Sequence, residues 1–301
     1  MSAIVVANAP VSFGIFEAAF GATKQLPYTQ VLSMIAEAGY QGTELGPYGY
    51  LPTEPEKLDR ELRHHGLKLG SSFVPLALAD AHRFDEARAE VRKVAALLRT
   101  QGVEEVIIAD AGDARRRAEG GRRPAGWTDA EWKVATRTLD TLARELRDDF
   151  GMRVVVHHHV GTYLETPEEI DRMLDETDPS LVGLLLDTGH YVYGGGDPVA
   201  VLAQRRDRIW YLHYKDVDEA KLERIRREKI DMDSAWRLGV FVPLGRGQVD
   251  FATLTRSLKD THYRGWVVVE QDTMADADGN LTPDPFQSAK ASREYLRTLG
   301  L

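Results

Sequence analysis

The regular alternation of short apolar runs with longer amphipathic stretches is the feature that most constrains the fold of this chain. Runs such as VGLLLD and WVVVE are apolar on both strand faces, which is typical of parallel strands covered on both sides. We expect eight strands, at Ala3–Ala7, Gly42–Leu45, Lys68–Phe73, Glu105–Ala109, Arg153–His157, Val182–Asp187, Ile209–His213 and Trp266–Glu270. Helical patterns lie between them at Tyr28–Ala38, Pro55–His65, Phe84–Thr100, Asp129–Phe150, Pro167–Glu176, Asp197–Arg206, Asp250–Lys259 and Pro285–Leu299. This alternation predicts an α/β fold of the (β/α)8 TIM barrel type.

The main alternative, a doubly wound open sheet, has less support because no GxGxxG motif opens any of the helices. A length of 301 residues suits one barrel, and no low-complexity linker or internal repeat divides the chain. We therefore predict a single domain over residues 1–301. Two segments, Gly112–Thr128 and Asp216–Val249, are longer than normal loops and follow the expected fourth and seventh strands. Such long excursions are often lids or binding loops.

Polar, metal-ligating residue types stand where the expected strands end. In a TIM barrel the carboxyl ends of the strands form the active-site face. Side chains point alternately to the two faces of a strand. This alternation predicts four side chains pointing into the barrel mouth at similar height on four neighbouring strands, those of His157, Asp187, His213 and Glu270. His157 and His159 share one strand face, and His158 takes the other.

Two imidazoles and two carboxylates suit manganese, cobalt, iron or zinc better than magnesium. A lone histidine at a strand end is more often a hydrogen-bonded structural group, and carboxylates after strands often cap helices. Four ligand-type residues on four successive strand ends favour a metal site over these structural roles.

Composition excludes several classes of site and partner. The chain has no cysteine, which rules out disulfides, thiolate zinc sites and a cysteine nucleophile, and which fits a cytoplasmic protein. A formal net charge of −9 disfavours nucleic acid or an anionic membrane surface as a partner. The start of the chain lacks a basic region and a long apolar core, so we expect no signal peptide. No apolar run approaches the roughly 20 residues of a membrane helix.

Eight segments along the chain carry recognisable motifs: NAPVSFG at 8–14, GTELGPYGYLPT at 42–53, FVPLAL at 73–78, HHHVGTYLETPEEID at 157–171, LLLDTGH at 184–190, HYKDV at 213–217, GVFVPLGRGQVDF at 239–251 and GWVVVEQD at 265–272. With these segments the chain resembles the xylose-isomerase-like TIM barrel superfamily of sugar isomerases and epimerases. LLLDTGH and HYKDV are specific to the superfamily. The segments HHHVGT, FVPLGRG and VVVEQD make the chain most similar to its inosose dehydratases of myo-inositol catabolism.

The resemblance implies a divalent ion, most often Mn²⁺ or Co²⁺, and Asp187, His213 and Glu270 match three of the family's ligands. The fourth ligand of the related epimerases is a glutamate at the end of strand five, where this chain has His157. The epimerases use two metal-bound glutamates, one on each face of the substrate. A chain that keeps only Glu270 suits an asymmetric reaction better than two-faced epimerisation. Whether His157 or His159 is the ligand stays open.

The implied reaction is loss of water from a small polyol ketone, 2-keto-myo-inositol (scyllo-inosose), to give a trihydroxycyclohexanedione. The metal stabilises the enolate formed when a base removes the α-proton, and a second group protonates the departing hydroxyl. Glu270 or Glu44 is the candidate base, and the candidate proton donors are His190, His159 and Lys215.

Two other catalytic functions and one non-catalytic function are alternatives to this dehydratase. A keto-sugar or ketose epimerase or isomerase would use the same metal-binding barrel. A phosphodiesterase resembling endonuclease IV would need more ligands than the chain offers. A non-catalytic sugar-binding barrel has little support beside a complete ligand set. A homo-oligomer is compatible with the sequence.

Overall fold

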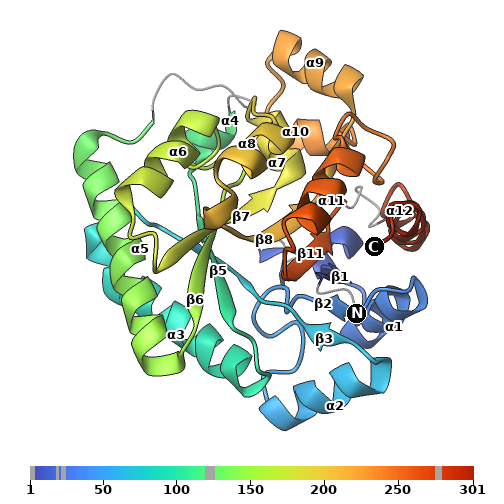
Figure 1. Cartoon of the computed structure of the whole chain (residues 1–301), viewed down its shortest axis with the longest axis horizontal. Helices are drawn as coiled ribbons and strands as arrows, with labels where there is room; N and C mark the ends of the chain where they lie inside the picture. The colour runs from blue at the N-terminus through green and yellow to red at the C-terminus, as the bar shows by residue number, and fades with distance from the viewer. Residues whose placement is uncertain (1–3, 18–19, 22–24, 119–125, 275–279) are drawn as a thin grey trace.

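A curled sheet of parallel strands, surrounded by helices, forms the centre of the molecule (Figure 1). The computed structural model describes residues 4–17, 20–21, 25–118, 126–274 and 280–301. Its nine sheet strands follow the order β3-β2-β1-β11-β8-β7-β6-β5-β4. Their bounds are β1 Ile4–Asn8, β2 Gly42–Thr43, β3 Lys68–Leu69, β4 Phe73–Leu76, β5 Glu105–Asp110, β6 Arg153–His157, β7 Val182–Asp187, β8 Ile209–Tyr214 and β11 Gly265–Val269. The predicted TIM barrel is confirmed.

The third barrel strand is divided in two, which differs from the single strand expected over Lys68–Phe73. β3 pairs with β2 on one side and β4 pairs with β5 on the other, so the two halves together complete the ring. Between them, a Cβ at Gly70 would lie only 2.5 Å from the Tyr211 hydroxyl inside the barrel. β2 is also shorter than expected. The backbone N–H of Leu45 still donates to the carbonyl of Ser71 (2.9 Å), which extends the contact beyond the regular ladder.

In the described part of the chain, eight helices cover the barrel. They are α1 Tyr28–Glu37, α2 Pro55–His65, α3 Phe84–Thr100, α5 Asp129–Phe150, α6 Pro167–Glu176, α8 Pro198–Gln204, α11 Phe251–Asp260 and α12 Pro285–Thr298. Thr128 and Thr166 cap α5 and α6 through capping boxes, and Gly66 and Gly151 end α2 and α5 in left-handed conformations. Two short helices, α4 Ala114–Ala118 and α7 Thr188–Tyr193, were not predicted. No helix in the described ranges has the length and apolar character to cross a membrane.

The apolar side chains form two layers, as the alternation along each strand requires. The outer layer packs between the strands and the helices. The inner layer fills the barrel with Ala7, Ile107, Val155, Leu185, Tyr211 and Val268, all fully buried. Because this interior is filled, polar side chains have room only at the mouth, above the last apolar residue of each strand.

The long excursion after β8 is a folded unit rather than an open loop. It contains the antiparallel pair β9 Asp216–Val217 and β10 Phe241–Val242, together with α9 Glu219–Glu228 and α10 Met232–Arg237, which lie at one edge of the molecule (Figure 1). Its residues Leu222, Ile225 and Ala235 pack in a separate buried cluster. The carboxylate of Asp216, at the start of the segment, accepts hydrogen bonds from four backbone N–H groups of the segment. Three of these donors lie near the end of the segment, so the carboxylate holds its two ends together. The other expected excursion contains α4, and its residues 119–125 lie outside the described residues.

Candidate active site

Four side chains from neighbouring strands converge at the mouth of the barrel. His157 ends β6, Asp187 ends β7, His213 lies in β8, and Glu270 directly follows β11 rather than ending it. His213 Nδ1 lies 3.1 Å from Glu270 Oε2 and 3.8 Å from Asp187 Oδ2, and His157 Nε2 lies 3.6 Å from Asp187 Oδ2. We call these four residues the first cluster. The structure therefore brings together all four residues predicted as metal ligands.

The donor atoms of the first cluster fit a single ion. Both ring nitrogens of His157, Asp187 Oδ2 and His213 Nδ1 are buried and have no hydrogen-bond partner among the described residues. Buried polar atoms normally have hydrogen-bond partners, so a group of buried polar atoms without such partners indicates a binding site for a ligand. Ligands about 2.1 Å from one ion lie at most about 4.2 Å apart, and the three measured separations are shorter than this.

The charges of the first cluster also suit a cation. Burial lowers the pKa of His157, so its imidazole is neutral and able to ligate. Burial has the same tendency at His213, but the carboxylates of Glu270 and Glu44 outweigh it and raise the pKa of His213 to about 10. The pocket thus holds enough negative charge to keep an imidazole protonated. A divalent ion would supply that positive charge instead.

Glu44 supports the first cluster from behind. Its Oε1 lies 2.9 Å from His213 Nε2, and the Tyr211 hydroxyl donates to the same oxygen (3.0 Å). This contact leaves His213 Nδ1 directed at Glu270 and Asp187. A carboxylate on the far nitrogen of a ligating histidine fixes its orientation and increases its basicity. The geometry therefore assigns Glu44 to orientation of His213.

The three successive histidines at the end of β6 have separate surroundings. His157 belongs to the first cluster, as described above. His158 points away from the mouth, and its Nε2 accepts a hydrogen bond from the backbone N–H of Asp187 (3.1 Å). His159 returns to the mouth, where its ring centroid lies 3.8 Å from that of His190. The predicted alternation of the three side chains is confirmed.

A second group of ligand-type side chains lies beside the first. His159, His190 and Asp272 each offer one atom within 4.8 Å of the others, and we call them the second cluster. Lys215, which follows β8, donates to Asp272 Oδ1 (2.7 Å) and has its Nζ 2.8 Å from His190 Nε2. Burial raises the pKa of Asp272 to about 6 against the opposing effect of this ammonium. The three expected proton donors, His159, His190 and Lys215, thus form one connected group.

Several residues of the mouth had not been predicted from the sequence. Asp272 lies two positions beyond Glu270, in a loop. The alternation of side-chain direction along a strand does not apply to a loop, so it could not predict where Asp272 points. Phe241 of β10 packs over His190, with ring centroids 5.3 Å apart, and Trp236 of α10 approaches His159 at 5.9 Å. Burial, together with the carboxylates of Glu270 and Glu44, raises the pKa of Glu17 to about 8. Asp272, Phe241 and Trp236 belong to segments that cross the mouth, and no local sequence pattern predicts the path of these segments.

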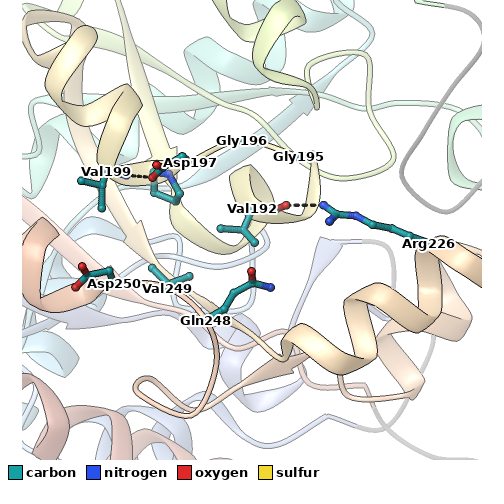
Figure 2. A pocket seen from close by; sticks show the side chains of 10 residues that line it. Val192, Gly195, Gly196, Asp197, Val199, Arg226, Gln248, Val249 and Asp250 are labelled. Atoms are coloured by element: carbon teal, nitrogen blue, oxygen red, sulfur yellow. Dashed lines mark hydrogen bonds between the residues drawn. The ribbon is translucent and has the colours of Figure 1, made fainter.

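A cavity lies away from both clusters. It measures about 390 Å³ and is bounded by the turn between α7 and α8, by Arg226 of α9 and by the segment before α11 (Figure 2). Arg226 donates to the backbone carbonyls of Val192 and Tyr193 at its edge. None of the residues of either cluster lines this cavity. The convergent polar groups, and not the volume, therefore identify the active site.

Comparisons with known proteins show the family of the chain. A family model described as a xylose isomerase-like TIM barrel matches residues 32–299. Inosose dehydratase from Geobacillus kaustophilus (strain HTA426) is 38% identical over 274 residues, covering 90% of this chain and 86% of that protein. The rhizopine catabolism protein MocC from Rhizobium meliloti is 37% identical and covers 90% of this chain and 81% of that protein.

Further relatives named inosose dehydratase are 30–33% identical. Among solved structures, the IOLI protein with a bound zinc atom superposes with a TM-score of 0.71 at 15% identity, covering 98% of this chain and 97% of that chain. At this identity the likeness concerns the fold. Inosose dehydratases are enzymes of the carbon–oxygen lyase class. The chain belongs to the xylose isomerase-like TIM barrel family and, within it, to the inosose dehydratases.

Proposed function

We propose that this enzyme removes water from 2-keto-myo-inositol (scyllo-inosose) and forms a trihydroxycyclohexanedione. The relatives' name supplies the substrate class. The observation that carries the proposal is the juxtaposition of the two clusters, in which unpartnered ligand atoms lie beside a connected group of two imidazoles and an ammonium. Removal of an α-proton and departure of a hydroxyl need these two kinds of group on one substrate.

The first cluster would hold the divalent ion, through His157, Asp187, His213 and Glu270. Two neutral nitrogens and two carboxylates suit Mn²⁺ or Co²⁺, the ions that the family resemblance favours. When bound, such an ion acts as a Lewis acid that polarises the ketone of the substrate and makes the neighbouring C–H more acidic.

Glu270 is the proposed base. Against the opposing effect of burial, His213 and Lys215 lower the pKa of Glu270 to about 2, so the carboxylate is ionised at neutral pH. The other candidate, Glu44, already accepts from Tyr211 and contacts His213 through the same oxygen. Glu270 therefore faces the substrate, and Glu44 acts as a positioning residue.

The departing hydroxyl receives its proton from the group formed by His159, His190 and Lys215. Lys215 Nζ lies 2.8 Å from His190 Nε2 and 3.1 Å from Glu270 Oε2, and the ring centroids of His159 and His190 are 3.8 Å apart. The strand-five ligand is a histidine, and a ligating nitrogen has no free lone pair with which to accept a proton. Glu270 is then the single metal-bound carboxylate placed beside proton donors, which favours elimination over inversion of a carbon centre.

The test is an assay of purified protein that has been dialysed against EDTA. Scyllo-inosose is added with and without Mn²⁺ or Co²⁺, and the absorbance of the enolised dione is followed over time. We expect product only with the ion, and little with Asp187→Asn. The variant Asp85→Asn, at an exposed position of α3, serves as the matched control and should behave as wild type. Unchanged substrate under every condition would overturn the proposal.

A further inference from the structure

The second cluster has the composition of a metal site but already surrounds a positive charge. His159, His190 and Asp272 place their ligand atoms within 4.8 Å of one another, which is the arrangement expected around an ion. The Lys215 ammonium reaches into the same space, 2.7 Å from Asp272 Oδ1 and 2.8 Å from His190 Nε2. It also lies 3.1 Å from Glu270 Oε2 and 3.3 Å from Asp187 Oδ2. Four acceptor atoms thus surround a group with three N–H donors.

The path of the Lys215 side chain is fixed by the surrounding backbone. A Cβ at Gly189 would lie 2.6 Å from Lys215 Cγ and 2.9 Å from its Cβ, so only glycine leaves space for the stem. The Thr188 hydroxyl donates to the Lys215 carbonyl and accepts from its N–H. The ring of Phe241 covers the ammonium, with Nζ 5.2 Å from the ring centroid. Lys215 is 1% exposed.

The charges of the two clusters lead to the same interpretation. Asp187, Glu270 and Asp272 are the three carboxylates that the clusters contain. Glu44, in contact with His213, is a fourth carboxylate beside them. One divalent ion in the first cluster and one ammonium between the clusters together supply three positive charges to offset this group. A second divalent ion would lie within a few ångström of the Lys215 ammonium in a buried pocket, where like charges repel strongly.

We propose that the Lys215 ammonium occupies the second cluster in place of a second metal ion, so that the chain binds one divalent ion and not two. The second cluster is then a latent site of the imidazole–carboxylate class. Replacing Lys215 with a neutral residue should open it to Mn²⁺, Co²⁺ or Zn²⁺. This inference concerns the number of bound ions and does not depend on which substrate the enzyme dehydrates.

The experiment measures bound Mn²⁺ per chain. Metal-free protein is titrated with Mn²⁺, and the free ion is followed by its EPR signal, so that weak sites are counted. We expect one ion per chain for wild type and for Lys133→Met, an exposed lysine of α5 that serves as the matched control. We expect two for Lys215→Met, with spin coupling between neighbouring ions, and one again for Lys215→Met combined with Asp272→Asn.

Two ions on the wild-type chain, or one ion on a folded Lys215→Met chain, would overturn the inference. If Lys215→Met does not fold by circular dichroism, Lys215→Gln is judged by the same criteria. No bound ion in wild type would contradict the proposed function as well. Two ions in wild type would contradict this inference alone, so the two failures are distinguishable.

Discussion

At the scale of single residues, the barrel mouth shows how one residue type acquires different roles from its surroundings. His157, His158 and His159 are consecutive, yet one belongs to the first cluster, one accepts from a backbone N–H and one lies against another imidazole ring at a tilt. Burial lowers the pKa of all three, so each is neutral at physiological pH. What distinguishes them is direction, which the alternation along β6 sets.

Asp187→Asn should weaken binding of Mn²⁺ at least about tenfold, since even the loss of groups behind the ligands has that effect. Asp187 Oδ2 lies in the first cluster, 3.3 Å from the Lys215 ammonium, whereas its Oδ1 accepts from the backbone N–H of His190 (2.8 Å) and caps α7. Asparagine retains an acceptor for the cap, so the fold should be preserved. Mn²⁺ titration by EPR measures the change. Wild-type affinity in the variant would remove Asp187 from the ligand set.

His157→Glu should keep some metal binding but lose at least about tenfold in dehydration rate, because an anionic ligand reduces the Lewis acidity of the ion. The new carboxylate also places a second base on the opposite face of the substrate. Slow hydrogen exchange or epimerisation of the keto-substrate should therefore appear in D2O, as measured by NMR. His64→Glu, at an exposed position of α2, is the charge-matched control. Dehydration at the wild-type rate would show that His157 is not a ligand.

The sequence was sufficient to predict the residues of the first cluster, because strand parity and strand ends are local properties. It was not sufficient for Asp272, which follows β11 in a loop and reaches the mouth through its contact with Lys215. Nor did it distinguish Glu44 from Glu270 as a base, since that choice depends on the contact of Glu44 with His213 across the barrel. Local sequence patterns do not show which distant segments of the chain come into contact.

At the scale of elements, the segment between β8 and α11 forms a cover over one side of the mouth. β9 and β10 pair at its base, and α9 and α10 pack on their own buried cluster. From it, Phe241 contacts His190 and Trp236 approaches His159. The Trp236 indole Nε1 is buried and has no partner among the described residues. A buried donor without a partner at an active site is suited to a hydroxyl of the substrate.

Trp236→Phe should lower kcat/KM roughly fivefold, the effect of losing one hydrogen bond of about 1 kcal/mol, while the melting temperature stays nearly unchanged. Phenylalanine keeps the aromatic contact with His159 and removes only the indole N–H. Steady-state kinetics and a thermal melt on the same preparation separate the two effects. Trp127→Phe, at a tryptophan that stacks on Tyr163 outside both clusters, is the control. Unchanged kinetics would show that the cover does not bind substrate through Trp236.

A deletion of residues 219–236 tests whether the cover as a whole contributes to turnover. We expect turnover to fall far more than the melting temperature, because the buried cluster that α9 and α10 share with Val160 and Tyr193 is separate from the main core of the barrel. An unchanged turnover rate in the deletion variant would mean that this unit plays no part in the active site.

The elements themselves were predictable where helix signals are strong. Pro55–His65, Phe84–Thr100, Asp129–Phe150 and Pro167–Glu176 have the expected bounds. The divided third strand was not predictable, because its break depends on the approach of Gly70 to Tyr211 from another strand. Within the excursion after β8, α10 and the small core were not predicted, since that core forms only when distant apolar residues meet.

At the scale of the whole molecule, the filled barrel interior confines polar chemistry to one end. The first cluster is buried and brings Asp187 and Glu270 together, with Glu44 behind His213, so a bound cation would offset repulsion between carboxylates at this end. The protein should therefore be more stable with its ion than without it. The stabilisation is about 2.7 kcal/mol when the free ion is at a hundred times its Kd.

Dialysis against EDTA should abolish activity and lower the melting temperature by roughly 5 °C, and Mn²⁺ or Co²⁺ should restore both. Differential scanning calorimetry of the dialysed and reloaded protein measures the shift. The Asp187→Asn variant should show little response to added ion. Full activity of a sample verified as metal-free would contradict the metal-dependent account.

The most direct test of the central claim is an NMR time course of wild-type enzyme, Mn²⁺ and scyllo-inosose in D2O. The mouth has a histidine at the end of β6 and Glu270 as its single proposed base beside the proton donors, which predicts that the dione accumulates and that no epimer of the substrate forms. Deuterium entering recovered substrate, with an epimer and without the dione, would contradict the account and assign the barrel to epimerisation.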